Sequence, residues 1–332
     1  MKEPSMSASS APLFTGVVPP VATPLLPDGG VDHASLERLV DYLVTSGVHG
    51  LFALGSTGET AYFTDDQRVE ILRTIVSAGG GRVPIIAGAI DLTSARIAAL
   101  ARRLVETGAD AVVTTAPLYT LNSPAEVDHH FRAIAAGVDA PLWAYDVPVR
   151  VHSKLGLGLL MDLAADSVIA GVKDSSGDDV GFRRLVAANR AAGHPLQLLT
   201  GHEIVVDAML LAGADGVVPG FANVEATGYV RLWDAAGRGD WEAARVEQER
   251  LNRAFEIVFQ PQGLSGDATG VGAFKAAMKE RGIIDHATMA FPTQALDEIA
   301  VERIHGILAE LDLLPGRVGD GAVGGAVSGR AS

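Results

Sequence analysis

The chain has 332 residues, no cysteine, 48% hydrophobic residues and a formal net charge of −14. A chain without cysteine forms no disulfide, thiolate metal site or cysteine nucleophile. Its acidic balance argues against nucleic acid or an anionic membrane surface as a partner. No apolar run reaches the roughly 18–20 residues of a membrane span, and we expect a cytoplasmic protein.

The two ends of the chain differ in composition from its middle. Residues 1–12 lack the apolar core of a signal peptide, and the last 17 or so residues are mostly Gly, Ala, Val and Ser without periodicity,. Such segments do not bury enough apolar surface to fold. We expect a disordered lead-in at 1–12 and a flexible tail at 315–332.

Short apolar runs alternate with longer amphipathic stretches between these ends. Runs typical of buried strands occupy residues 16–22, 50–53, 83–88, 111–114, 141–145, 169–173, 196–200 and 216–219,. Helical patterns follow them at residues 32–45, 65–78, 94–106, 125–136, 157–163, 179–192, 203–211 and 224–236,. Eight parallel βα units in about 220 residues favour a (β/α)8 TIM barrel over an open doubly wound sheet.

Three further helical patterns come after the eighth unit, at residues 240–259, 271–281 and 293–311. We expect them to form a C-terminal helical region over 238–314, packed on a barrel that spans 13–237. The first strand is not followed by a GxGxxG segment, which lowers the case for a dinucleotide-binding fold.

The chemistry of a barrel enzyme lies where its strands end. Lys173 ends the sixth predicted strand. It is either a solvated surface lysine or, in a partly desolvated site, an amine nucleophile for Schiff-base chemistry on a ketone. After the second strand, residues 55–59 (Gly-Ser-Thr-Gly-Glu) offer N–H groups and hydroxyls that suit a carboxylate,.

Other strand ends add Tyr119, Tyr145 and Arg150. Each tyrosine taken alone is more often a packing residue than a catalytic one. Gathered at one barrel mouth, an amine, phenols, a carboxylate cradle and a guanidinium are the parts that a Schiff-base lyase needs.

Three segments, in this order and at these spacings, resemble one known family: 55–59, 145–148 (Tyr-Asp-Val-Pro) and 171–174 (Gly-Val-Lys-Asp). The family is the dihydrodipicolinate synthase / N-acetylneuraminate lyase family of pyruvate-dependent class I aldolases. The resemblance covers roughly residues 14–314. It implies that Lys173 forms a Schiff base with pyruvate or another 2-oxo acid and that Tyr145 relays protons.

The same resemblance implies roles for further residues and an assembly. Ser56, Thr57 and Gly58 would hold the pyruvyl carboxylate, and Gly201 and Val218 would line the pyruvate pocket. Tyr119 would match a tyrosine that some members lend across a dimer interface. The resemblance also implies a homotetramer built as a dimer of dimers, without a metal or an organic cofactor.

Departures from the synthase pattern bear on the second substrate. Ser56 stands where synthases usually carry threonine, Leu118 replaces the first tyrosine of a pair, and Asp146 replaces an asparagine. Residues 270–275 lack the usual Asn-Pro segment. These differences favour an aldolase that cleaves a 2-keto-3-deoxy sugar acid or a related hydroxy-oxo acid to pyruvate and an aldehyde.

Other residues keep alternatives open. Arg150 falls where synthases bind the carboxylate of aspartate semialdehyde, which favours 4-hydroxy-tetrahydrodipicolinate synthase. His202 and Glu203 replace an acidic pair and could meet sugar hydroxyls, although Glu203 could also favour the start of the next helix. A dehydratase and a non-catalytic barrel that binds 2-oxo acids are further alternatives.

Overall fold

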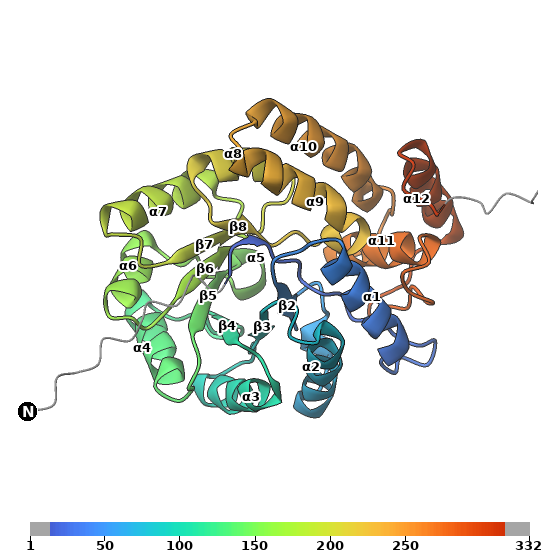
Figure 1. The fold of residues 1–332 in the computed structure, drawn as a ribbon. Helices are drawn as coiled ribbons and strands as arrows, with labels where there is room; N and C mark the ends of the chain where they lie inside the picture. The colour runs from blue at the N-terminus through green and yellow to red at the C-terminus, as the bar shows by residue number, and fades with distance from the viewer. Residues whose placement is uncertain (1–13, 316–332) are drawn as a thin grey trace, which may run out of the picture.

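The computed structural model describes residues 14–315 as a closed barrel of parallel strands (Figure 1). The sheet has the order β1-β8-β7-β6-β5-β4-β3-β2. A parallel bridge from Pro20 to Phe52 joins the segment after β1 to β2, so the sheet closes on itself. The strands are β1 (Gly16–Val17), β2 (Leu51–Ala53), β3 (Ile85–Gly88), β4 (Ala111–Thr115), β5 (Leu142–Asp146), β6 (Gly171–Asp174), β7 (Gln197–Thr200) and β8 (Gly216–Val217).

Helices surround the strands, as the alternating pattern predicts, and the (β/α)8 barrel is confirmed (Figure 1). The predicted lead-in at 1–12 and nearly all of the predicted tail at 315–332 lie outside the described residues. The barrel helices are α1 (His33–Thr45), α2 (Asp65–Gly79), α3 (Ser94–Thr107), α4 (Pro124–Ala135), α5 (Pro148–Val151), α6 (Leu157–Ala165), α7 (Asp179–Ala191), α8 (Val206–Ala212) and α9 (Ala222–Gly237), with a 3-10 turn η1 (Thr60–Tyr62).

Three C-terminal helices pack on one side of the barrel (Figure 1). They are α10 (Trp241–Phe255), α11 (Gly266–Glu280) and α12 (Glu298–Glu310), with a second 3-10 turn, η2 (Glu256–Phe259), between α10 and α11. Helix α10 packs on α9, and α12 packs on α11. Within residues 14–315, no helix has both the length and the apolar character needed to cross a membrane.

Capping residues explain where several helices begin. Thr64 accepts a hydrogen bond from the N–H of Gln67, and the Gln67 side chain accepts one from the N–H of Thr64. Such a capping box stabilises the first turn by satisfying free N–H groups. It fixes the start of α2 immediately after the loop that contains residues 55–59.

Three helix starts differ from the sequence prediction by three residues or more. Helix α12 begins at Glu298, five residues later than predicted, and the other two differences bear on the site. Helix α8 begins at Val206, so Glu203 lies in the loop after β7. Helix α11 begins five residues earlier than predicted, because the Ser265 hydroxyl accepts a hydrogen bond from the N–H of Ala268 at 3.3 Å. Both differences place additional side chains at the mouth of the barrel.

A buried ion pair fastens α11 to the loop after β2. Lys275 is fully buried, and its Nζ donates to Glu59 Oε2 and, at 2.8 Å, to the carbonyl of Thr288. Glu59 Oε1 accepts from the N–H of Ala290 at 2.8 Å. Every charged atom of the pair is therefore satisfied away from water, which burial of charge requires.

We expect Lys275→Met to leave Glu59 buried without its counter-charge. Removing one partner of a buried pair costs about 3–5 kcal/mol, and the free energy of unfolding should fall by about that amount. Urea denaturation followed by circular dichroism measures the change. Lys279→Met, on the exposed side of α11, is the matched control and should shift stability by about 0.5 kcal/mol or less. Equal losses in both variants would contradict this role.

Candidate active site

Lys173 and Tyr145 lie side by side at the end of the barrel. They are paired in register on the neighbouring parallel strands β6 and β5, so their side chains point the same way,. Lys173 Nζ lies 3.9 Å from the centroid of the Tyr145 ring and 4.7 Å from that of Phe52. Lys173 is 6% exposed and Tyr145 3% exposed. A single amine is thus held against a phenol in a nearly closed pocket.

The Tyr145 hydroxyl is placed to exchange protons. Its oxygen lies 3.5 Å from Ser56 Oγ, at the end of β2. Burial alone would raise the pKa of Tyr145, but the nearby charge of Lys173 and hydrogen bonds from Ser56, Lys173 and Ser175 outweigh burial and lower the pKa. A phenol with a lowered pKa gives up and takes back a proton more readily at neutral pH.

The loop of residues 55–59 passes close to other backbone at the same end of the barrel. A Cβ on Gly58 would meet the carbonyl oxygen of Val21 at 3.0 Å, and a Cβ on Gly220 would lie 3.4 Å from Thr57 Oγ1. Thr23 Oγ1 donates to the carbonyl of Gly58 at 2.8 Å. A side chain at residue 58 would press on a backbone carbonyl, so glycine suits this close approach,. The contact with residue 220 places Thr57 beside the segment that follows β8.

Gly201 and Val218 lie where β7 and β8 end. A Cβ on Gly201 would approach Ser175 Oγ to 2.0 Å and the carbonyl oxygen of Asp174 to 3.2 Å, so a larger residue would require Ser175 to move. The N–H of Gly201 donates to the carbonyl of Asp174, and the N–H of Val218 donates to the carbonyl of Thr200 at 2.7 Å. Backbone bonds thus fix Gly201 against the end of β6 and Val218 against the end of β7.

Glu203 turns inward from the loop after β7. Its Oε2 accepts from the N–H of Phe221 at 2.7 Å and lies 3.5 Å from the Tyr229 hydroxyl. Burial raises the pKa of Glu203 to about 7, although those hydrogen bonds and the charge of Lys173 oppose the rise. Its neighbour His202 is instead paired with Asp179, at 2.9 Å between Nδ1 and Oδ1.

Asp146 does not add a free negative charge beside Tyr145. Its carboxylate is buried, forms an ion pair with Lys154 and accepts from the N–H of Leu155 at 3.1 Å. Burial raises the pKa of Asp146 despite these contacts. The substitution at this position is therefore compensated locally by Lys154, which the sequence pattern did not reveal.

Arg150 is paired with a residue from the C-terminal helices. It lies on the short helix α5, which the sequence pattern missed, and both of its terminal nitrogens donate to the carboxylate of Asp267 in the first turn of α11. The two side chains line a cavity of about 330 Å³ that also contains Ser56 and Tyr145 in its wall.

Tyr119 is not brought to the other candidate residues within this chain. Its side chain is 87% exposed on the loop after β4. Leu118, the residue before it, lines the cavity instead. Any contribution of Tyr119 to a site would have to come from contact with a second copy of the chain.

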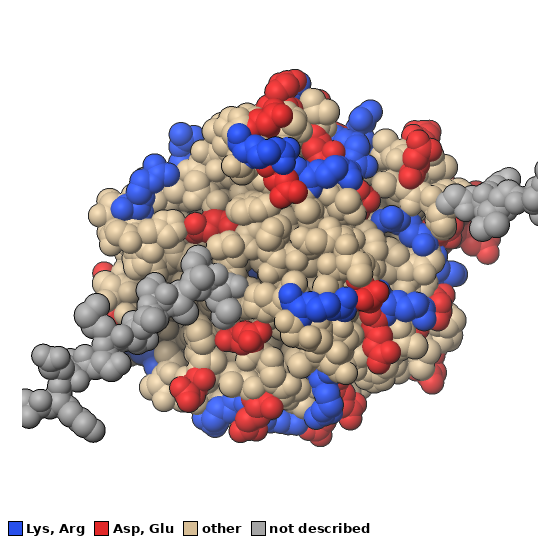
Figure 2. Space-filling model, in the orientation of Figure 1, with Lys and Arg blue, Asp and Glu red and all other residues tan. Residues whose placement is uncertain are grey.

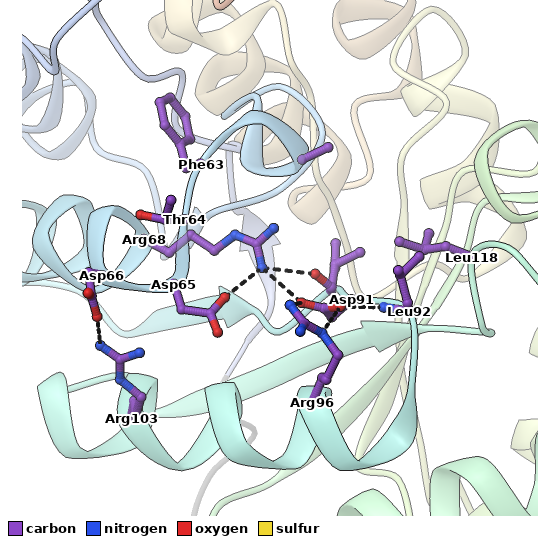
Figure 3. Close-up of a pocket in the computed structure, with 12 residues that line it drawn as sticks. Phe63, Thr64, Asp65, Asp66, Arg68, Asp91, Leu92, Arg96, Arg103 and Leu118 are labelled. Carbon is purple, nitrogen blue, oxygen red and sulfur yellow. Dashed lines mark hydrogen bonds and ion pairs between the residues drawn. The ribbon is translucent and has the colours of Figure 1, made fainter.

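A second hollow of about 760 Å³ lies between α2 and α3 (Figure 3) and shares Ala61, Ile90 and Leu118 with the cavity. Arg68 Nη1 lies between Asp65 and Asp91, and Arg96 donates to Asp91 at 2.6 Å. These charges are paired with one another. Positive and negative side chains are likewise interspersed over the visible face of the molecule (Figure 2), without a field of one sign that would suit a polyanion,.

Among the described residues, no cluster of three or more His, Asp or Glu side chains has the geometry of a metal site. His130, one of two adjacent histidines, is buried and lies 2.9 Å from Ser94 Oγ and 3.0 Å from the carbonyl of Thr115. Its role is in packing between α3 and α4.

The raised pKa of Glu203 predicts a pH dependence of stability. Glu203 has a folded-state pKa of about 7 against an ordinary value of 4.5, so between these pH values the folded protein keeps a proton that the unfolded chain releases. The stability that this proton contributes is lost as pH rises from 4.5 to 7. We expect the unfolding free energy of the wild type minus that of Glu203→Gln to fall over this range. Urea denaturation at several pH values measures it. The control is Glu302→Gln, at an exposed residue, whose unfolding free energy should change with pH as that of the wild type does. The prediction fails if the unfolding free energy of Glu203→Gln also changes with pH as that of the wild type does.

Comparison with known proteins gives one consistent match. The model of the dihydrodipicolinate synthetase family matches residues 13–311. An uncharacterized DapA-like lyase of Halobacterium salinarum is 34% identical over 301 residues, which cover 90% of this chain and 94% of that relative. The 4-hydroxy-tetrahydrodipicolinate synthase of Shewanella denitrificans is 30% identical over 298 residues, covering 90% and 97% of the two chains.

Solved structures agree in fold. YagE, an Escherichia coli K12 prophage protein of the dihydrodipicolinic acid synthase family, was solved in complex with pyruvate. It matches with a TM-score of 0.85 and 28% identity, covering 91% of this chain and 99% of YagE. A monomeric dihydrodipicolinate synthase variant matches with a TM-score of 0.84 and 26% identity, covering 91% and 98%.

Proposed function

The chain belongs to the dihydrodipicolinate synthetase family and is a lyase, and on this premise we propose that it makes or breaks a carbon–carbon bond at C3 of pyruvate through a Schiff base on Lys173. The observation that carries the proposal is the contact between Lys173 Nζ and Tyr145, at 3.9 Å from the ring centroid. A non-catalytic binder of 2-oxo acids would need neither an amine nor a phenol at this position.

The chemistry follows from these two groups. Lys173 condenses with the C2 carbonyl of the oxo acid. Two protons of its ammonium group leave with the carbonyl oxygen as water, and the resulting iminium withdraws electrons from the adjacent bonds. In cleavage, the Tyr145 oxygen takes the proton of the C4 hydroxyl, the C3–C4 bond breaks, and its electron pair moves into an enamine. Protonation of C3 and hydrolysis then release pyruvate and the aldehyde. Condensation is the same path in reverse.

The surrounding residues support defined tasks in this scheme. Ser56 Oγ, 3.5 Å from the Tyr145 oxygen, would pass the proton onward. Thr57 and Gly58 would hold the pyruvyl carboxylate through N–H groups and the Thr57 hydroxyl. Gly201 and Val218 would bound the methyl end of pyruvate, and Glu203 would meet the second substrate.

For the substrate we propose a 4-hydroxy-2-oxo acid, the class to which the 2-keto-3-deoxy sugar acids belong. The synthase activity named for several relatives would need a free cation for the carboxylate of aspartate semialdehyde. Arg150, the residue expected for that task, is bound to Asp267 at both terminal nitrogens, which favours the aldolase.

We also propose a homotetramer, a dimer of dimers, in which Tyr119 completes the site of a neighbouring copy. The 87% exposure of Tyr119 in the single chain supports this assignment, since an exposed tyrosine suits an interface. One neighbouring structure is that of a monomeric dihydrodipicolinate synthase variant, so the proposed assembly is to be measured by its mass in solution.

Borohydride trapping tests the nucleophile. We expect reduction in the presence of pyruvate to add about 72 Da, the mass of a reduced pyruvyl imine, to the peptide that contains Lys173. Lys173→Ala should lose the adduct and the lyase activity while keeping its circular dichroism spectrum. The control is Lys279→Ala, an exposed lysine that should keep both. An adduct on another lysine would refute the assignment.

Replacement of Tyr145 separates proton transfer from imine formation. We expect Tyr145→Phe to retain the borohydride adduct but to lower turnover about 10²–10⁴-fold, the usual contribution of a positioned acid–base group. Steady-state assay of pyruvate release gives the turnover number. Tyr42→Phe, which removes a buried hydroxyl on α1 that bonds the carbonyl of Val224, controls for structural damage. Unchanged turnover in Tyr145→Phe would remove it from the mechanism.

A further inference from the structure

The cavity that leads to Tyr145 is apolar over most of its wall. Beside Ser56 and Tyr145, its lining includes the side chains Ala61, Tyr62, Ile90, Leu118 and Val147. Ile90 and Val147 are buried under this surface, and Leu118 is half-buried. The part of a substrate that extends beyond the reacting carbons would therefore lie against hydrocarbon.

The charged groups in this wall are already engaged. Arg150 and Asp267 hold each other through two hydrogen bonds, and Glu59 is taken by Lys275 and by the N–H of Ala290. A substrate carboxylate placed near Arg150 would also face Asp267. The pair presents no net charge to the cavity.

Two of the hydroxyl groups in the wall already bond to other protein groups. Thr115 Oγ1 donates to the carbonyl of Ala116 at 2.8 Å, and the Tyr62 hydroxyl accepts from Thr293 at 3.2 Å. Thr60 Oγ1 makes no hydrogen bond within the described residues, but it is sealed from the cavity surface. Each hydroxyl of a polyol buried here would lose its water partners, and a hydroxyl left unpaired is costly to bury.

We propose that the aldehyde half of the substrate carries an apolar substituent, aryl or alkyl, in place of a polyol or a carboxylate. This inference rests on the proposed aldolase function and narrows it away from the sugar acids. Cleavage converts R–CH(OH)–CH2–CO–COO⁻ into R–CHO and pyruvate, with R the hydrocarbon group. The C3–C4 electron pair passes to the iminium, the C4 hydroxyl proton goes to Tyr145, and C3 regains a proton, so no oxidant or reductant is required.

Two substrates that share the reacting atoms test the proposal. They are 4-hydroxy-2-oxo-4-phenylbutanoate and 2-keto-3-deoxygluconate, which differ in the substituent on C4. We expect kcat/KM for the phenyl compound to exceed that for the sugar acid by about tenfold or more, the scale on which apolar pockets discriminate. Equal values, or a preference for the sugar acid, would overturn the proposal.

Variants locate the preference in the cavity wall. Leu118→Gln should lower kcat/KM for the phenyl compound, and with it the ratio of this value to kcat/KM for the sugar acid. The matched control is Leu92→Gln. Leu92 and Leu118 both line the second hollow, between α2 and α3 (Figure 3), but Leu92 does not line the cavity. This change should therefore preserve the ratio. An unchanged ratio in Leu118→Gln, or an equal change in Leu92→Gln, would remove the apolar wall as the cause.

A third variant tests the charge pairing. Asp267→Asn frees Arg150, and we expect it to raise kcat/KM for condensation of pyruvate with aspartate semialdehyde about tenfold, since a guanidinium binds a carboxylate bidentately. No gain would contradict the masking of Arg150. Borohydride trapping with pyruvate alone distinguishes failure of the proposed function from failure of this inference. A missing adduct refutes the Schiff-base function. A normal adduct together with a preference for the sugar acid refutes only the apolar substituent.

Discussion

The buried ion pair between Glu59 and Lys275 connects the two parts of this molecule. Glu59 ends the loop of residues 55–59 and has a left-handed backbone conformation, with φ of 55°. A non-glycine residue rarely holds that conformation without support from its surroundings. The support comes from α11, whose Lys275 binds the Glu59 carboxylate. Ser56, three residues earlier, is thereby held near the Tyr145 hydroxyl.

The barrel and its two main site residues follow from repetition in the sequence. Each βα unit carries its own signals, an apolar strand run and an amphipathic helix, so errors of a few residues at element ends do not alter the topology. Lys173 and Tyr145 could be placed together because neighbouring parallel strands end at one edge. The resemblance drawn from residues 55–59, 145–148 and 171–174 is confirmed by the family match over residues 13–311.

The partners of the charged residues could not be predicted in the same way. Glu59 and Lys275 are 216 residues apart, and Arg150 and Asp267 are 117 residues apart. No local pattern reports such pairs, because they depend on how α11 packs on the barrel. From the sequence alone, Arg150 can be either a carboxylate-binding residue or a surface arginine, and its pairing with Asp267 is not visible. The helical pattern of residues 203–211 predicts that Glu203 starts a helix, whereas Glu203 lies in the loop after β7 and its carboxylate accepts from the N–H of Phe221.

The ion pair of Arg150 and Asp267 joins two separate parts of the sequence, α5 within the barrel and α11 in the C-terminal region. The candidate reacting groups, Lys173 and Tyr145, stand on barrel strands, where a substitution disturbs the closed sheet. Asp267 belongs to the first turn of a peripheral helix, where a point substitution leaves the strands intact. If Asp267 sets what the cavity accepts, as we propose, a single codon outside the barrel can change the second substrate while the groups on the strands stay the same.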